Sequence, residues 1–110
     1  MIGVMGTTPA GRLRPVSEAP AEGELVEGIV AVRQLVVEQI LSAPSAVPHE
    51  YLQDDDEGVV VLAGAAVLDV AGERLELGPG DWAFLPAGVR HTVVETSEAT
   101  SWLAVRLQPD

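Results

Sequence analysis

The chain has 110 residues, 17 acidic side chains against 6 basic ones, a net charge of −11 and no cysteine. All the basic residues are arginines, and so acidic a surface repels phosphate backbones and anionic lipids, so neither nucleic acid nor a membrane is an expected partner. Without cysteine there are no disulfides and no zinc–thiolate sites. The composition indicates one domain of a cytoplasmic protein.

The first part of the chain changes character near residue 24. Residues 1–23 are rich in Gly, Pro, Ala, Ser and Thr, which predicts a flexible N-terminal arm. Residues 26–32 and 35–42 are rich in β-branched side chains and predict two strands. A helix over 24–41 is the competing interpretation, because no clear breaker follows Gly28; the β-branched content favours strands.

The remainder alternates short apolar segments with turns rich in Gly and Pro. Residues 43–48 predict a loop, a strand is expected to begin within 49–53, and 54–57 form an acidic corner. Further strands are expected at 59–63, 65–70, 73–77, 82–85, 92–96 and 102–107. Short strands between such turns predict an all-β fold, an antiparallel β-barrel or jelly roll, over residues 24–110.

The segment 80–91 carries the most informative pattern. Gly80 and Gly88 supply the free backbone that tight turns need, and Pro86 ends the strand between them. His91 then lies where the next strand begins, a position that suits a metal ligand or a proton carrier. A side chain or a negative φ is not expected to be tolerated at Gly88, nor at Gly64.

Gly80, Pro86, Gly88 and His91 match the second motif of the cupin superfamily, G-x5-P-x-G-x2-H, at every fixed position. The segment 57–64 matches the E-x6-G end of the first cupin motif, and the interval 65–79 has the length typical of small single-domain bacterial cupins. The chain therefore resembles a cupin over about residues 35–107. It departs from the second motif at its end, where Glu95 stands in place of the usual Asn.

The resemblance implies a divalent metal ion at the barrel mouth, held in most cupins by three His and one Glu. Here Glu57 and His91 are in register. Tyr51 and Gln53 stand where two further histidines would fall, and both offer oxygen ligands instead. The implied metal is iron, manganese, nickel or zinc, and a site short of histidine is expected to hold it only substoichiometrically.

The chain has one other histidine, His49, displaced by two residues from the expected position. In a strand it shares a face with Tyr51 and Gln53, so it is a candidate third ligand that completes a 2-His-1-carboxylate set. With the other spacing of the first motif, Glu50 and Leu52 occupy the histidine positions.

Two residues near the expected mouth are candidates for contact with substrate. Arg90, beside His91, is placed to hold an anionic group, and a salt bridge to a nearby acid such as Glu95 is its alternative role. Trp82 is a candidate substrate contact, although Trp82 and Trp102 are both expected to pack in a core that has few other aromatic residues.

Three functions stay open from the sequence. The first is a metal-binding cupin that handles a small molecule by oxygenase- or isomerase-type chemistry, with the metal on His91 and Glu57. The second is a ligand-binding or sensing module that has lost its metal and has no turnover. The third is a metal-free isomerase or cyclase in which His91 or Glu57 moves a proton.

A homodimer is expected as well. Residues 26–41 offer more apolar strand than one small barrel needs. A bare edge strand is prone to aggregate, and pairing with a second copy removes the edge. Related small cupins commonly pair through their N-terminal strands.

Overall fold

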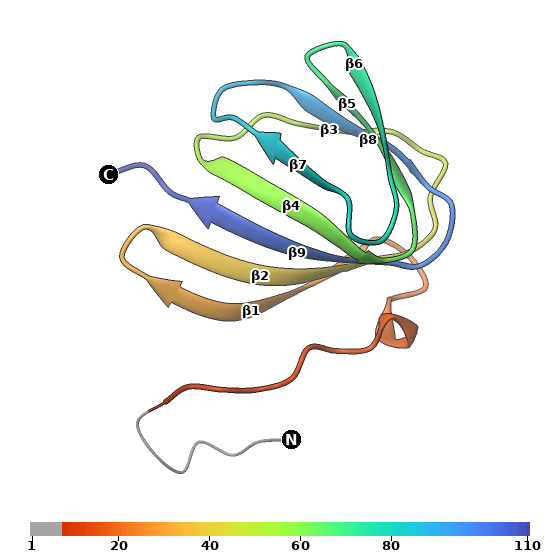
Figure 1. Cartoon of the computed structure of the whole chain (residues 1–110). Coiled ribbons are helices and arrows are strands. Elements are labelled where there is room, and N and C mark those ends of the chain that lie inside the picture. The colour runs from red at the N-terminus through yellow and green to blue at the C-terminus, as the bar shows by residue number, and fades with distance from the viewer. Residues whose placement is uncertain (1–7) are drawn as a thin grey trace.

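The computed structural model describes residues 8–110, and its regular structure is all strand apart from one turn of 3-10 helix, Val16–Glu18 (Figure 1). The strands are β1 (Glu24–Val32), β2 (Leu35–Ser42), β3 (His49–Tyr51), β4 (Asp56–Ala63), β5 (Ala66–Val70), β6 (Glu73–Leu77), β7 (Trp82–Leu85), β8 (His91–Thr96) and β9 (Thr100–Leu107). The two strands expected before residue 43 are confirmed as the antiparallel hairpin β1–β2, and the competing helix is wrong. No helix of the described part is long and apolar enough to cross a bilayer.

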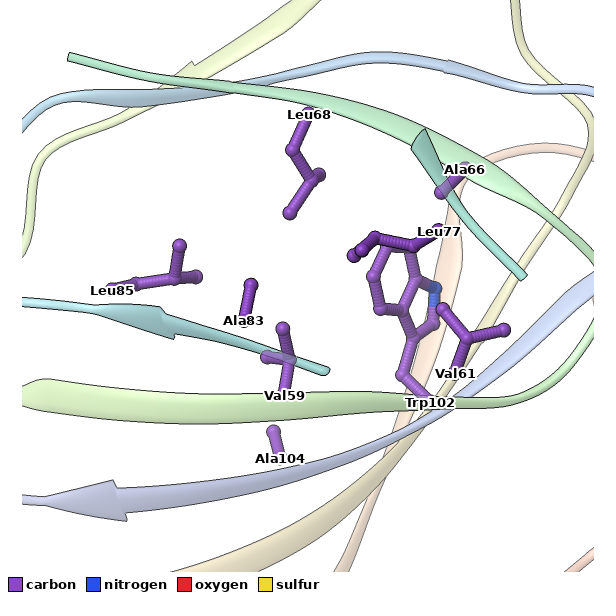
Figure 2. Packing of buried hydrophobic residues seen from close by; sticks show 9 residues of the cluster. All are labelled: Val59, Val61, Ala66, Leu68, Leu77, Ala83, Leu85, Trp102 and Ala104. Carbon is purple, nitrogen blue, oxygen red and sulfur yellow. The ribbon is translucent and has the colours of Figure 1, made fainter. Parts of the chain in front are cut away.

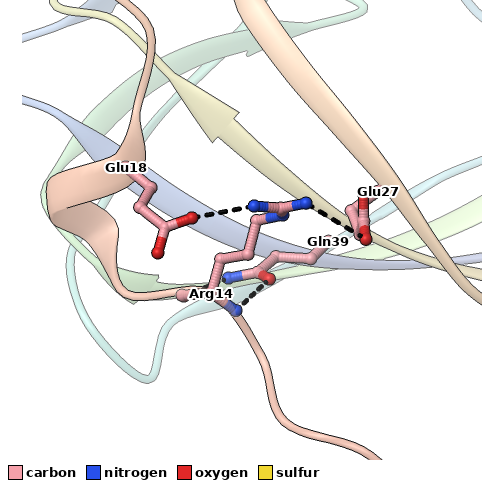
Figure 3. A network of polar contacts seen from close by, with 4 residues as sticks. All are labelled: Arg14, Glu18, Glu27 and Gln39. Atoms are coloured by element: carbon pink, nitrogen blue, oxygen red, sulfur yellow. Dashed lines mark hydrogen bonds and ion pairs between the residues drawn. The ribbon is translucent and has the colours of Figure 1, made fainter. Parts of the chain in front are cut away.

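Residues 1–7 of the expected N-terminal arm lie outside the described residues. The following segment runs beside β2 and is attached to it at Arg14 (Figure 3). The backbone N–H of Arg14 donates to Gln39 Oε1 at 2.9 Å, and Gln39 Nε2 donates to the carbonyl of Arg14 at 2.9 Å. The Arg14 guanidinium bonds Glu18 and Glu27 at the surface. Gln39, almost fully buried, thus satisfies its amide through this segment and through Ser101, whose Oγ accepts from Gln39 Nε2 at 3.0 Å.

Two antiparallel sheets face each other, as expected for a jelly roll (Figure 1). One has five strands in the order β1-β2-β9-β4-β7, and the other has four in the order β3-β8-β5-β6. The sheets are joined by chain crossings rather than by a continuous hydrogen-bonded wall, so the expected barrel is an open two-sheet form of this fold.

The core lies between the sheets and follows from the alternation of side chains along each strand (Figure 2). In β4, Val59 and Val61 point inward and are buried, whereas Leu62 is exposed on the outside. Trp102 is 5% exposed and supplies the largest side chain of the cluster, with its Nε1–H donating to Ser42 Oγ at 3.1 Å. The expectation that Trp102 packs in the core is confirmed.

The same expectation is wrong for Trp82. Its side chain is 74% exposed, because Ala83 and Leu85 take the inward positions of β7 and leave Trp82 and Phe84 on the outer face. The apolar character of β7 on both faces hides this choice from the sequence.

Gly64 ends β4 where the chain crosses from one sheet to the other. Its φ is +90°, and a Cβ there would lie 2.5 Å from the carbonyl oxygen of Ala99. Gly88 has a φ of +74° with open space around it. Both glycines therefore occupy the left-handed backbone region expected of them, and Gly64 also allows a close approach between two chain segments.

Candidate functional site

A cavity of about 210 Å³ opens between the sheets, at the end where β4 and β8 begin and β9 ends. Its walls are apolar, formed by Ile40, Val59, Leu68, Leu85, Val93 and Trp102. Its polar lining consists of Glu24, Tyr51, Gln53, Glu57, His91 and Arg106. An apolar cavity with a few convergent polar groups is the usual form of a small-molecule site.

Glu57 enters the cavity from the start of β4, where it is paired with Leu85 on one side and Arg106 on the other. Its side chain is buried, and Gln53 Nε2 donates to its Oε1 at 3.0 Å. Burial raises the pKa of Glu57 above its ordinary value; the hydrogen bond from Gln53 opposes that rise, and the negative charge of Asp55 adds to it. A carboxyl group in this setting takes up a proton more readily than one in water.

His91 reaches the cavity from the first position of β8, opposite Tyr51 of β3. The two rings stack, with centroids 5.4 Å apart and planes inclined by 15°. His91 is 5% exposed, and its Nδ1 is buried without a hydrogen-bond partner among the described residues. Burial lowers the pKa of His91, an effect that the carbonyl of Val89 opposes, so the imidazole is neutral at pH 7.

Two further residues of the lining, Arg106 and Glu24, were not predicted from the sequence. Arg106 was detectable, because it alternates with the buried Trp102 and Ala104 along β9 and must share their inward face. Glu24 carries no such local signal, because only the pairing of β1 with β2 brings it beside Ser42, whose hydroxyl donates to Glu24 Oε2 at 3.0 Å.

The structure brings four of the expected site residues, Tyr51, Gln53, Glu57 and His91, around this one cavity. His49 is not among the lining residues of this cavity. It begins β3, two residues before Tyr51, and borders an adjoining hollow of about 260 Å³. The proposed set of His49, Glu57 and His91 is therefore not assembled.

The two expected substrate contacts also lie elsewhere. Arg90 is exposed and bonds Glu50 on β3 at 2.6 Å, rather than Glu95 or a group in the cavity. Trp82 is on the outer face of the five-stranded sheet, with Phe84. Neither side chain lines the cavity that contains His91.

The donor set does not fit the four-ligand metal site that the cupin motif implies. Among residues 8–110, no three His, Cys, Asp or Glu side chains are grouped so as to hold a metal ion. Gln53 uses its amide N–H on Glu57, and Tyr51 lies flat against the ring of His91. At the four motif positions one imidazole and one carboxylate remain, fewer than the three protein ligands usual in catalytic zinc sites.

Comparison with known proteins agrees with the motif and the fold. The family model for the cupin domain matches residues 39–106. An uncharacterised protein of Aquifex aeolicus (strain VF5) is 43% identical over 61 residues, which are 56% of this chain and 50% of that protein, so the match spans only half of that relative's length.

Solved structures show the same relationship. A protein of Ralstonia eutropha JMP134, provisionally named a mannose-6-phosphate isomerase, is 30% identical with a TM-score of 0.78, over 90% of this chain and 100% of that one. A cupin superfamily protein of Desulfitobacterium hafniense DCB-2 has a TM-score of 0.72 at 20% identity, over 93% and 97% of the two chains, and shows the fold alone. With the motif, the facing sheets and the matched domain in agreement, the chain belongs to the cupin family.

Proposed function

We propose that the chain binds a small organic molecule in the cavity between its sheets, holding a polar atom of that molecule between His91 and Glu57 without a resident metal ion. The observation that carries the proposal is His91, a residue of the cavity lining whose buried Nδ1 has no hydrogen-bond partner among the described residues. An unpaired buried polar atom destabilises a fold, so its presence in a concave site is best explained by a ligand that completes it.

Metal-free proton transfer is the reaction that this site suits, and it is the second candidate function. The pKa of Glu57 is raised and that of His91 is lowered, both chiefly by burial. One of these two groups can take a proton from a ligand and the other can return one, and pKa values displaced from their ordinary range by burial suit such proton transfer in an isomerase. The provisional name of the Ralstonia protein makes mannose 6-phosphate one compound to assay.

The test uses the two tryptophans of the chain, one of which lines the cavity while the other is on the outer face. In a Trp82→Phe variant, the emission of Trp102 reports on the cavity alone. Titration with cyclohexanemethanol, a small probe with one hydroxyl group, should change this emission, and dialysis against a chelator should leave the binding curve unchanged. His91→Ala and Glu57→Ala, made in the same background, should each weaken binding.

Binding that appears only after iron, manganese, nickel or zinc is added would overturn the metal-free proposal and favour the metal-dependent cupin instead. Metal analysis of freshly purified protein gives the same distinction independently. If neither His91→Ala nor Glu57→Ala affects binding or metal content, the cavity is not a functional site, and an interaction or sensing role becomes the favoured function.

We also propose that the chain forms a homodimer through β1. This strand is at the edge of the five-stranded sheet, and its exposed apolar side chains are Val26, Ile29, Val30 and Val32. Light scattering at micromolar concentration should give twice the chain mass, and Val30→Lys should reduce it. Val47→Lys, at an exposed position of a loop, is the matched control and should leave the mass unchanged.

A further inference from the structure

Building on the proposed function, we infer that the cavity selects molecules that carry a hydrogen-bond donor and no negative charge. Two carboxylate side chains, Glu24 and Glu57, face the cavity. Apart from His91, the one basic side chain in the lining is Arg106. The balance of these charges decides which ligands are accepted.

The positive charge of Arg106 is already paired with two carboxylates. Its Nε donates to Glu38 Oε1 at 3.0 Å, and its Nη1 donates to Asp55 Oδ2 at 2.6 Å. The partner side chains are 18% and 9% exposed, so these ion pairs are shielded from solvent. Two carboxylates on one guanidinium leave a net negative charge behind this wall, so a phosphate or carboxylate in the cavity would meet a cation whose charge is already offset.

Glu57 keeps an acceptor oxygen without a partner among the described residues. Gln53 donates to Oε1 of Glu57, whereas no described residue donates to Glu57 Oε2. On the neutral ring, Nδ1 of His91 has no partner. Burying a ligand anion against these atoms would cost its desolvation while the charge of Arg106 is already offset, whereas a hydroxyl or ammonium group would find acceptors.

The experiment compares three probes that share one ring and differ in one group: cyclohexanemethanol, cyclohexylmethylamine and cyclohexanecarboxylate. Binding is followed by Trp102 emission in the Trp82→Phe variant at pH 7.5. The alcohol, the amine or both should bind at least about tenfold more tightly than the carboxylate. The inference also predicts no measurable binding of mannose 6-phosphate.

A second variant tests the cause. Glu38→Gln keeps an acceptor oxygen for Arg106 but removes one of the two charges that neutralise it, so the affinity for cyclohexanecarboxylate should rise severalfold. Glu76→Gln changes the net charge equally from the outward face of β6, between the inward-facing Leu75 and Leu77, and should have no such effect.

The outcomes separate the two proposals. Carboxylate binding as tight as alcohol binding in the Trp82→Phe background would overturn the inference and leave the proposed function standing. Equal responses of Glu38→Gln and Glu76→Gln would overturn the role given to the Arg106 ion pairs. If none of the three probes binds, the proposed function fails, and the inference fails with it.

Discussion

The two ends of the space between the sheets differ in how their buried polar groups are paired. At one end, near Gly64 and Thr100, the buried threonine hydroxyls have partners: the Thr100 hydroxyl has the carbonyl oxygens of Ala65 and Glu98 at 3.2 and 2.9 Å, and Thr96 Oγ1 donates to Ala43 O at 2.8 Å. At the other end, His91 is buried with an unpaired nitrogen. We call the first the packed end and the second, with Glu57 and His91, the polar end.

This difference shows where stability and binding are separated in a small fold. The packed end joins the two sheets through a close backbone crossing and paired hydroxyl groups, so we expect it to contribute strongly to the free energy of unfolding. The polar end keeps a cavity and poorly solvated ionisable groups, which lower that free energy and are useful only when a ligand is present. Substitutions at the packed end should therefore change stability, and those at the polar end should change binding.

The largest effect is expected at the packed end, from Gly64→Ala. A Cβ there would collide with Ala99 O and Thr100 Oγ1, both 2.5 Å away, on top of the strain of a φ of +90°. Because overlap and backbone strain add, the variant should lose about 3 kcal/mol or more in a urea unfolding experiment.

Gly88→Ala is the control for that prediction. Its φ of +74° imposes similar backbone strain, but its Cβ would meet no atom within 4 Å. It should lose only about 1 kcal/mol. Equal losses in the two variants would show that the crossing at Gly64 is not the tight contact that distinguishes the packed end.

The next effect compares the two tryptophans. Trp102→Phe removes part of the core volume and the hydrogen bond to Ser42, so the free energy of unfolding should fall by about 2 kcal/mol. Trp82→Phe, on the outer face, should change it by less than about 0.5 kcal/mol. Urea denaturation followed by circular dichroism measures both, and a larger loss for Trp82→Phe would mean that the outer face is covered in solution.

The contrast between these tryptophans also shows which features of the fold can be predicted from the sequence. Strands such as β6 alternate polar and apolar side chains, and motif positions such as Gly64 and His91 have fixed backbone roles, so the fold was predictable from the sequence. In β7 every side chain is apolar, so the pattern has no polar face that would mark the outside. The choice is made by packing against the second sheet, which is a property of the tertiary structure.

The site was predictable only along single strands. The motif register placed Tyr51 and Gln53 with Glu57, and all three residues line one cavity. The bond from Arg90 to Glu50 joins a loop to another strand, and Glu24 arrives from the distant start of β1. Such contacts depend on strand order and register, which hydrophobic alternation does not specify.

At the polar end, Glu57→Gln should raise stability. The amide keeps an oxygen for Gln53 and removes a buried carboxylate charge, so the free energy of unfolding at pH 7 should increase by on the order of 1 kcal/mol. The pKa of Glu57 is raised from 4.5 by burial, so its protonated form stabilises the fold below pH 4.5 and this contribution is lost as pH rises through the folded-state pKa. The gain from the substitution should therefore disappear below pH 4.5.

The control for this prediction is Glu76→Gln, on the outward face of β6, which should give no pH-dependent gain. Denaturant titrations at a series of pH values measure both variants. A loss of stability on Glu57→Gln at pH 7 would contradict this prediction. It would mean that a positively charged group or a metal ion binds the Glu57 carboxylate.

The smallest effect on stability, with a large effect on binding, is expected at His91. His91→Phe keeps a ring to stack on Tyr51 and removes the unpaired Nδ1, so the free energy of unfolding at pH 7 should change by less than about 0.5 kcal/mol. His91→Ala also loses the stack and should cost about 1 kcal/mol.

The same two variants should also differ from the wild type in pH dependence and in binding. The pKa of His91 is lowered from 6.5 by burial, so the stability that this group contributes is complete above pH 6.5 and is lost as pH falls through the folded-state pKa. Neither variant should show that loss of stability. Both should also weaken the binding of cyclohexanemethanol about tenfold or more, because the nitrogen and not the ring holds the ligand. Retained binding in His91→Phe would mean that the shape of the cavity alone determines ligand binding, and that the buried nitrogen has no role in it.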